Sequence, residues 1–462
     1  MLRPSLQTFL ILTLTTGLVG SAQAAVTAAE AARLGTQLTP VGADATGNPE
    51  GTIPPYTGGL PATTRPPGYQ ANSGRWADPY AGEKPIFSIT AGNMEHYADK
   101  LSEASKALLQ RHPSYRMDIY PSHRSTAMPP AVLEATRKNA TNARLAKDGL
   151  ALEGAYGGVP FPLPRNGHEV MWNHLARYNG HANEFNSRNW YVDASGRAVN
   201  SGEIHAHQQS PMFDPKGDET ALKKNGNFLA QATWNFTGPP MVVGNATLYL
   251  DTLDPLTQPR RAWTYNAASR RIRLAPDVAY DTPIASQGGV TTYDDIYLFD
   301  GAMDLFDFKL LGKREMFIPY NSYAVTFHAT AQQLLTPRHL NPDHARWELH
   351  RVWVVEASLK PGKRHGYARR LFYFDEDLGG GGMSDSFDAT GRLIKGLFLA
   401  SVQLYDSQTP LVRTYWGYDL RSGLYSLANH MGDPGMGFKN LPEGAPPFTF
   451  TPDALVSRGS RR

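Results

Sequence analysis

The spacing of apolar residues changes near residue 190, and this change limits the possible folds more than any other feature of the sequence. Before that point apolar residues recur at helical spacing, and after it they recur at every second position. The clearest pair of alternating segments is 347–360 and 367–375. Pro361, Gly362 and Gly366 stand in the short connection between them, as is typical of a β-hairpin.

Further alternating segments follow one another without a helical pattern between them. They lie at 227–236, 246–250, 261–265, 271–274, 392–405, 411–418 and 423–429. Strands joined by short turns form an antiparallel meander. The sequence therefore predicts an α+β fold that is mainly β, with one large, curved antiparallel sheet over 190–430. The few helices precede this sheet and are expected to cover its concave side.

Three helices are predicted between residues 93 and 180. The first spans 93–111, and the second spans 129–145 and begins at a proline pair. The third begins after Asn166, which has Glu169 three residues later, as in a capping box.

Residues 1–24 have the pattern of a secretory signal peptide. Arg3 precedes an apolar stretch at 9–19, and Ala22 and Ala24 flank Gln23 in a small-x-small cleavage motif. We therefore expect cleavage near Ala24 and a periplasmic location. No later segment reaches the roughly 18 apolar residues of a membrane helix, so no integral membrane segment is expected after cleavage.

The composition excludes several classes of function. The chain has no cysteine, so it has no disulfides, thiol chemistry or iron–sulfur clusters, and its fold must depend on a core. The net charge of +3 is too small to indicate nucleic-acid binding.

The segment 25–92 is rich in proline and glycine but carries aromatic residues such as Trp76, which disordered segments usually lack. We expect an extended arm that lies on the folded body. One domain is predicted at 93–452, followed by a disordered tail at 453–462.

Aromatic residues alternate along several predicted strands, where they form either a packed core or the wall of an apolar ligand cavity. The sequence does not separate these two possibilities. The candidate cavity residues are Trp234, Phe236, Trp263, Tyr265, Trp353, Phe372, Phe374 and Tyr415.

Arginines concentrate on the predicted hairpin at 260–274. Arg260, Arg261, Arg271 and Arg273 are candidates for contact with anionic lipid headgroups or an acidic partner. The alternative is an ordinary solvated face of the sheet.

Two histidine patterns suggest metal binding at first sight. His168 and His174 are six residues apart, which places them about 120° apart around a helix and prevents them from sharing one ion. His205 and His207 share one face of a strand, which can begin a metal site, but no third ligand is identifiable. No metal site, cofactor or catalytic residue is therefore predicted, and the common nucleophile and phosphate-loop motifs are absent from the sequence.

Two further segments are interpreted as exposed turns. The four glycines at 379–382 predict a flexible hairpin tip. Asp375, Glu376 and Asp377 before them predict a solvated acidic turn, with cation binding as the alternative.

Several long blocks together resemble the proteobacterial family labelled domain of unknown function 1329. They are 29–35, 38–43, 48–54, 137–141, 154–162, 260–265, 280–283, 313–321 and 348–357. That family is similar to the LolA/LolB-like superfamily of periplasmic lipoprotein carriers. The resemblance implies an incomplete antiparallel β-barrel closed by helices around an apolar cavity, an association with RND-type transporters or outer-membrane proteins, and no established catalytic residues. The glycines at 379–382 depart from the tryptophan-bearing tip that is common in the family.

The expected function is that of a periplasmic carrier for a lipid, a lipoprotein acyl chain or another hydrophobic ligand. A scaffold protein of an envelope transporter complex is the alternative. A hydrolase of envelope lipids or glycans is a third, and a carboxylate paired with His205 or His207 in a cleft would favour it.

Overall fold

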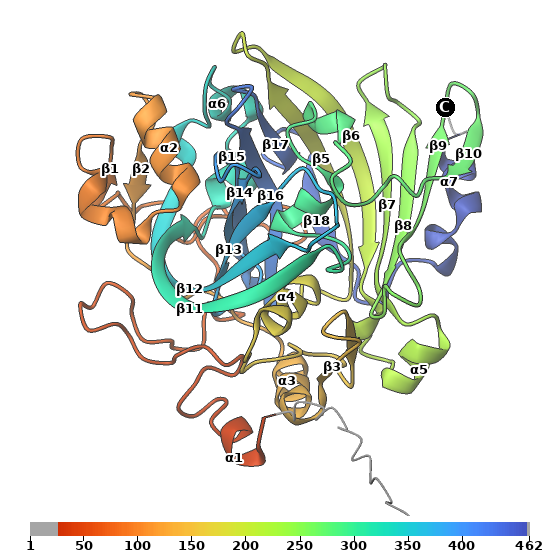
Figure 1. Ribbon diagram of the computed structural model, residues 1–462, viewed down its shortest axis with the longest axis horizontal. Helices are drawn as coiled ribbons and strands as arrows, with labels where there is room; N and C mark the ends of the chain where they lie inside the picture. Colours follow the sequence, from red (N-terminus) through yellow and green to blue (C-terminus); the bar gives the residue numbers. More distant parts are fainter. Residues whose placement is uncertain (1–25, 460–462) are drawn as a thin grey trace, which may run out of the picture.

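One large sheet organises residues 26–459, the part of the chain that the computed structural model describes (Figure 1). Within this part it contains 16 strands, and the path from neighbour to neighbour is β1-β2-β12-β13-β14-β15-β16-β17-β5-β6-β7-β8-β9-β10, with β11 beside β12 and β18 beside β5. A separate small sheet pairs β3 with β4. The predicted signal peptide lies outside the described residues.

All nine predicted alternating segments coincide with strands of the described part, but the other nine strands there were not predicted, and β1–β4 lie wholly before the predicted start of the sheet at residue 190. Their bounds are β1 Phe87–Ile89, β2 Met117–Ile119, β3 Arg144–Ala146, β4 Ala151–Glu153, β5 Ala182–Val192, β6 Ala198–Gln209, β7 Phe228–Gly238, β8 Ala246–Thr252, β9 Arg261–Asn266, β10 Arg271–Leu274, β11 Phe306–Pro319, β12 Arg346–Leu359, β13 Arg369–Asp375, β14 Gly382–Phe387, β15 Leu393–Leu404, β16 Thr409–Asp419, β17 Tyr425–His430 and β18 Gly437–Asn440.

The sheet is mostly antiparallel and is not closed, since its path runs from β1 at one end to β10 at the other. The pairing of β12 with β2 is parallel. This confirms the predicted fold class, including the β12–β13 hairpin.

Two of the strands that were not predicted, β14 and β11, have weak alternation for physical reasons. Every residue of β14 is buried, so no polar face marks it. In β11 the register shifts between Leu310 and Gly312, which interrupts the period of two.

The helices are short. They are α1 Ala28–Ala31, α2 Glu103–Arg111, α3 Pro130–Asn142, α4 Gly167–Leu175, α5 Glu219–Lys224, α6 Ala331–Leu334 and α7 Pro452–Gly459. Short helices of other types are η1 Met94–Lys100, η2 Pro211–Phe213, η3 Ala285–Gln287, η4 Tyr293–Leu298, η5 Ala324–His328, η6 Pro342–His344, η7 Tyr405–Ser407 and η8 Pro447–Phe450.

The continuous helix predicted at 93–111 is broken in two. Leu101 is extended, and the Ser102 side chain caps α2 by accepting a hydrogen bond from the Ser105 amide. The predicted Asn166 cap is present, because its side chain accepts from the amide of Glu169.

The centre of the sheet is covered on both faces, and not only on one as the sequence analysis predicted. On one face Leu108 of α2 packs into a cluster with Phe398 of β15 and Trp416 of β16. On the other, Met171 of α4 packs into a cluster with Leu397 and Leu399 of β15. We call this second side the α4 face.

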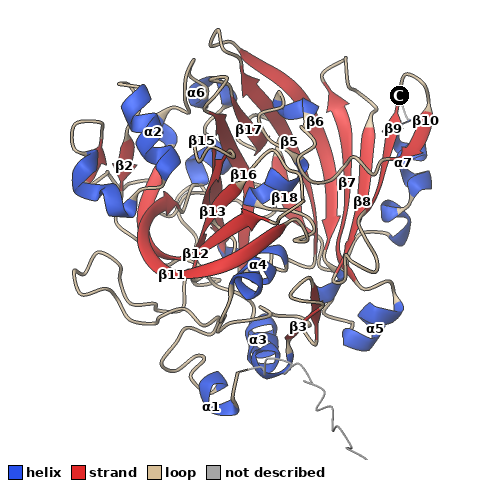
Figure 2. Ribbon diagram, viewed as in Figure 1, coloured by secondary structure: helices blue, strands red, loops and turns tan. Residues whose placement is uncertain are grey.

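The proline-rich arm is mostly loop and lies on the folded body (Figure 2). The Trp76 indole donates to Asp406 at 2.8 Å, and Arg75 donates to the carbonyls of Met431, Gly432 and Asp433. The arm ends in β1, a strand of the main sheet. Trp76, an aromatic residue of the arm, is therefore buried against the folded body.

The disordered tail predicted at 453–462 is wrong for residues 453–459, which belong to helix α7. Ala454 and Leu455 are fully buried, and Leu455 packs with Leu248 and Tyr265. Two apolar residues one after the other were too short a pattern to indicate a helix. Residues 460–462 lie outside the described part.

The acidic turn and the glycine tip are also buried, contrary to the prediction. Arg124 donates to both carboxylate oxygens of Asp377 at 2.7 Å, and Lys313 donates to Glu376 at 2.5 Å. A Cβ atom added at Gly382 would lie 1.9 Å from the carbonyl oxygen of Tyr373, so the close approach of the backbone requires glycine there. The basic partners come from distant segments, which local sequence cannot reveal.

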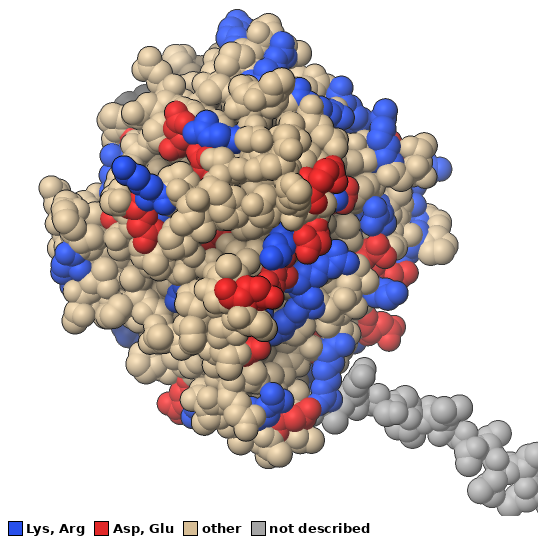
Figure 3. All heavy atoms as spheres, turned by 90° about the vertical axis from the view of Figure 1, so that its left-hand side faces the viewer, with Lys and Arg blue, Asp and Glu red and all other residues tan. Residues whose placement is uncertain are grey.

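The face that carries α2 shows acidic and basic side chains next to one another (Figure 3). Lys106 pairs with Glu103, and Arg116 pairs with Asp118 and Asp343. No helix among residues 26–459 is both long and apolar enough to cross a membrane.

Candidate functional site

A cavity of about 280 Å³ lies between the end of α4, the ends of β7 and β8, and the segment 276–302. We call it the α4 cavity. Its wall is mainly apolar and includes Trp172, Leu175, Leu229, Pro255 and Ala279. Engineered apolar cavities of about 150 Å³ admit benzene, so the α4 cavity has room for a larger apolar group.

Arg260 lines the α4 cavity, and its guanidinium group is paired with two carboxylates. It donates to both oxygens of Asp251 at 2.6 and 2.7 Å and to Asp300 at 3.0 Å. Burial opposes its charge, but the two carboxylates outweigh burial and raise the pKa of Arg260 above its usual range. Asp251 and Asp300 therefore balance the positive charge of Arg260 inside the protein, and Arg260 is not exposed on the surface of the hairpin.

A second cavity, of about 80 Å³, adjoins the first and shares Leu175, Leu229 and Asp300 with it. We call it the arginine cavity, because Arg177 and Arg413 both line it. Arg177 follows the C-terminus of α4, and Arg413 lies in β16 with 5% of its surface exposed. The chain thus brings two guanidinium groups to one wall from segments 236 residues apart.

Within the described part of the chain, the two guanidinium groups of the arginine cavity form no ion pair. Among residues 26–459, no carboxylate lies within ion-pair distance of Arg177 or Arg413, and the buried Nε atom of each lacks a hydrogen-bond partner. Burial and the neighbouring Arg413 lower the pKa of Arg177 to about 10. Asp300 lines the same cavity and attracts Arg177 from beyond ion-pair distance, but it already pairs with Arg260. A buried charge that is only partly balanced is costly, so the pair favours binding of an anion.

Tyr297 holds the two arginines in place from the side. Its ring centroid lies 5.2 Å from the guanidinium carbon of Arg177 and 5.2 Å from that of Arg413. Tyr297 adopts a left-handed conformation with φ of 53°, at a kink within η4. Backbone strain of this kind persists only where surrounding contacts enforce it.

A buried ion network enforces the position of η4. Arg370 donates to Asp294 at 3.0 Å and to Asp295 at 2.9 Å. Lys395 donates to Asp295 at 2.9 Å, and His365 lies 2.9 Å from Asp294. These contacts anchor the segment that carries Tyr297 to β13 and β15.

A third cavity, of about 70 Å³, lies over β5–β8 beside η3 and η4. Trp234, Phe236 and Tyr415 line it, and these are three of the eight aromatic residues predicted to form a ligand cavity. Tyr249 lines both this aromatic cavity and the arginine cavity, and it separates them.

The other five predicted cavity residues lie elsewhere. Phe372 and Phe374 are fully buried in the core, where the ring of His174 stacks on Phe374 at 4.3 Å. Trp263 and Tyr265 pair with Leu248 and Ala246 and so face α7 on the opposite side of the sheet.

Trp353, the last of the eight, lies on β12 beneath the ammonium group of Lys313, 4.5 Å from the indole centroid. The eight residues therefore do not line one cavity. The sequence showed the period-two alternation of these strands, but it did not show which face of each strand points toward a cavity.

The remaining arginines of the hairpin are exposed. Arg261 lies over the ring of Phe228, Arg273 donates to the Thr264 hydroxyl, and Arg271 is on the edge strand β10. Their contact with headgroups or a partner stays a prediction.

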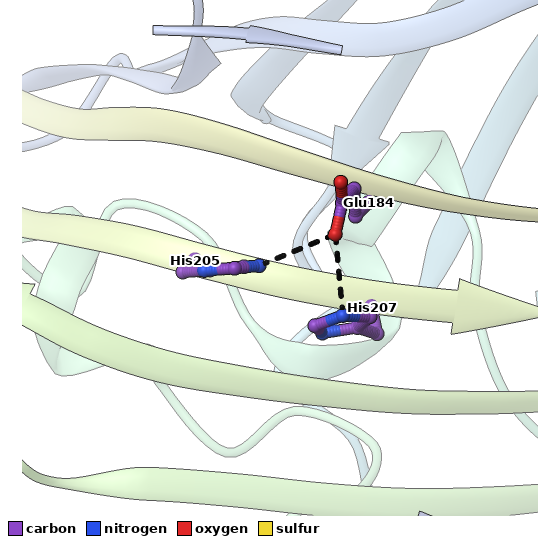
Figure 4. Close-up of side chains that lie close together, drawn as sticks. All are labelled: Glu184, His205 and His207. Carbon is purple, nitrogen blue, oxygen red and sulfur yellow. Dashed lines mark ion pairs between the residues drawn. The ribbon is translucent and has the colours of Figure 1, made fainter. Parts of the chain in front are cut away.

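His205 and His207 do share one face of β6, and the structure brings Glu184 of β5 to them (Figure 4). The Glu184 carboxylate lies 3.8 Å from the Nε2 atom of His205 and 3.4 Å from that of His207. The sequence analysis missed this third group because strand register, and not sequence spacing, makes it a neighbour. The three cavities above are lined by other residues.

His168 and His174 do not come together, as the spacing predicted. His168 contacts Phe308, whereas the Nε2 atom of His174 donates to the carbonyl oxygen of Phe299 at 3.0 Å. Burial lowers the pKa of His174 well below its usual range, which keeps it neutral.

Sequence reasoning also missed Arg177, Arg413, Tyr249 and Tyr297. One signal was available, since Arg413 interrupts the apolar run of a predicted strand between Val412 and Thr414. A charge within a strand that is buried on both faces needs a partner or a ligand.

Comparison with known proteins gives the family. An uncharacterized protein of Pseudomonas aeruginosa is 40% identical over 447 residues, covering 95% of each chain. Among solved structures, a putative outer membrane lipoprotein-sorting protein domain from Vibrio parahaemolyticus covers 62% of this chain and 97% of its own, with 15% identity and a TM-score of 0.42.

Two further solved structures are similar. A DUF1329 family protein from Desulfovibrio piger has 15% identity and a TM-score of 0.41, over 60% of this chain and 92% of its own. A LolA superfamily protein from Nitrosomonas europaea has 12% identity and a TM-score of 0.36, over 63% and 100%. The model of the family described as protein of unknown function DUF1329 matches residues 88–456, and the chain belongs to that family.

Proposed function

We propose that this protein binds an amphipathic molecule with an anionic head and an apolar tail, and carries it in the periplasm. The observation that carries the proposal is the pair Arg177 and Arg413, which line a cavity beside a larger apolar one and form no ion pair among residues 26–459. The anionic head lies against the two guanidinium groups, and the tail extends into the α4 cavity.

The energetics favour such a ligand. A carboxylate or phosphate supplies the counterion that the buried arginines lack, and charged hydrogen bonds of this type are the strong ones. Burial of the tail adds about 25 cal/mol per Å² of apolar surface before the cost of association is subtracted. A ligand with both an anionic head and an apolar tail accounts for a charged pocket and an apolar pocket that share one wall, whereas a purely ionic or purely apolar ligand accounts for only one of them.

The periplasmic part of the proposal depends on the signal-like residues 1–24, which lie outside the described residues. Cell fractionation with N-terminal sequencing of the exported chain tests it. Service to an RND-type transporter or an outer-membrane protein stays a prediction from the resemblance.

Ligand binding is tested with the mature chain purified without detergent. We expect alkyl carboxylates and alkyl phosphates to displace a fluorescent fatty-acid probe, and alcohols of the same chain length to displace it at least about 10-fold less well. The two anions distinguish a fatty acid from a phospholipid as the source of the head. Native mass spectrometry would show any co-purified lipid.

Arg413→Met and Arg177→Met are the test variants, and Arg392→Met is the matched control at an exposed position outside the hairpin and the cavities. Anion binding should fall in the first two and stay unchanged in the control. Equal affinity for acids and alcohols, or unchanged binding in Arg413→Met, would overturn the anionic head. Absence of any uptake would overturn the carrier proposal.

A further inference from the structure

Pairing of β5 with β6 places one carboxylate and two imidazoles on a single face of the sheet. Glu184 stands directly opposite His207, and Asn186 stands opposite His205. Residues two apart on a strand point to the same side, so His205 lies diagonally across from Glu184. This arrangement follows from the backbone register and requires no loop.

The three side chains converge (Figure 4). One ligand atom from each lies within 4.8 Å of the other two. The Oε2 atom of Glu184 is 3.4 Å from His207 Nε2 and 3.8 Å from His205 Nε2. Tetrahedral zinc with bonds of about 2.0–2.1 Å places its ligand atoms about 3.4 Å apart, so small side-chain rotations suffice.

The donor set selects among metals. Two imidazoles and one carboxylate suit Zn²⁺ and its transition-metal neighbours, whereas Mg²⁺ and Ca²⁺ prefer oxygen ligands alone. Three protein ligands leave a fourth tetrahedral position for water or another small ligand.

The surroundings support a rigid site with access from solvent. The side chains of Glu184, His205 and His207 are 31%, 39% and 14% exposed. Lys439 of β18 lies 3.6 Å from the other carboxylate oxygen, Oε1, which leaves Oε2 facing the histidines. Strands on both sides of Glu184 hold the backbone in place.

We propose that Glu184, His205 and His207 form a binding site for a divalent transition-metal ion, of which Zn²⁺ is the best match. The site is separate from the arginine cavity and does not depend on the proposed carrier function.

The test is calorimetric titration of Zn²⁺ into the untagged mature chain after treatment with a chelator. We expect one ion per chain and a rise in melting temperature with Zn²⁺ concentration. Co²⁺ serves as a spectroscopic probe, since tetrahedral Co²⁺ absorbs visible light strongly. Mg²⁺ should not compete.

His207→Ala and Glu184→Gln should each weaken binding by more than about 10-fold. His96→Ala, which removes an exposed histidine elsewhere, is the matched control and should bind like the wild type. The metal-free melting temperatures of all variants show whether each is folded, and His205→Gln provides a gentler third variant.

Two results would overturn the site. One is the absence of Zn²⁺ binding by the folded wild-type chain. The other is equal Zn²⁺ binding in the wild type and in folded variants at positions 184, 205 and 207. Binding of the fatty-acid probe should not change in these variants, so failure here is distinct from failure of the carrier proposal.

Discussion

The guanidinium carbon of Arg413 lies 5.2 Å from the centroid of the Tyr297 ring. This contact joins the middle of the sheet to the kinked η4 segment that covers it. Arg413 has no carboxylate partner within ion-pair distance among the described residues, so the aromatic face is its main compensation.

Arg413→Met should stabilise the ligand-free protein. The change removes a buried charge and keeps most of the side-chain volume, so we expect the free energy of unfolding to rise by about 1–3 kcal/mol. Urea unfolding measures it, with the exposed Arg392→Met as the near-neutral control. A loss of stability would mean that Arg413 is structural and not kept for a ligand.

Arg370→Met should have the opposite effect. It leaves Asp294 and Asp295 buried without their main counterion, which should cost about 3–5 kcal/mol. The neighbouring Arg369 is half-exposed and pairs with Glu356, so Arg369→Met should cost less than about 1 kcal/mol. Similar losses in both variants would contradict the anchoring role of the network.

His350 should make stability depend on pH. Burial opposes its charge, but Asp375 and Glu348 outweigh burial and raise the pKa of His350 from 6.5 to about 9. The folded state therefore holds the proton more tightly than the unfolded state. This stabilisation is fully present below pH 6.5 and is lost as the pH rises through about 9.

His350→Gln removes that pH dependence. The difference in unfolding free energy between the wild type and the variant should be greatest below pH 6.5 and should shrink by roughly 3 kcal/mol by pH 9. His96→Gln is the exposed control. A difference that grows with pH would refute the assignment.

Tyr249→Ala should alter the ligand preference. The ring separates the arginine cavity from the aromatic cavity, and its removal should merge them. Longer alkyl anions should then gain affinity relative to shorter ones in the displacement assay, although truncation should cost about 3–5 kcal/mol of stability. Tyr249→Phe keeps the ring and should retain the wild-type preference.

Leu455→Ala should weaken the packing of the C-terminal helix α7 against the sheet. Leu455 is fully buried against β8 and β9, so we expect a loss of about 2–4 kcal/mol in thermal or urea unfolding. Val456 is 40% exposed, and Val456→Ala should change little. Equal effects would show that α7 does not pack on the sheet in solution.

Local patterns in the sequence predicted the fold class and nine of the 18 strands in the described part of the chain. The alternation in 347–360 and 367–375 predicted β12 and β13 because a strand that is buried on one face shows its period directly. The Asn166 cap could also be predicted, since its hydrogen-bond partner, the amide of Glu169, is only three residues away. Every residue of the short strand β14 is buried, and this strand was missed.

Only the tertiary structure decided which charged groups are paired with one another and which are available to bind a ligand. Asp377 looked solvated until Arg124, 253 residues earlier, was placed beside it. Glu184 became a neighbour of His207 through strand register alone. Arg177 and Arg413 came to one cavity wall from different elements. Electrostatic and ligand interactions depend on distance in space, and sequence spacing encodes distance only within a single helix, strand or turn.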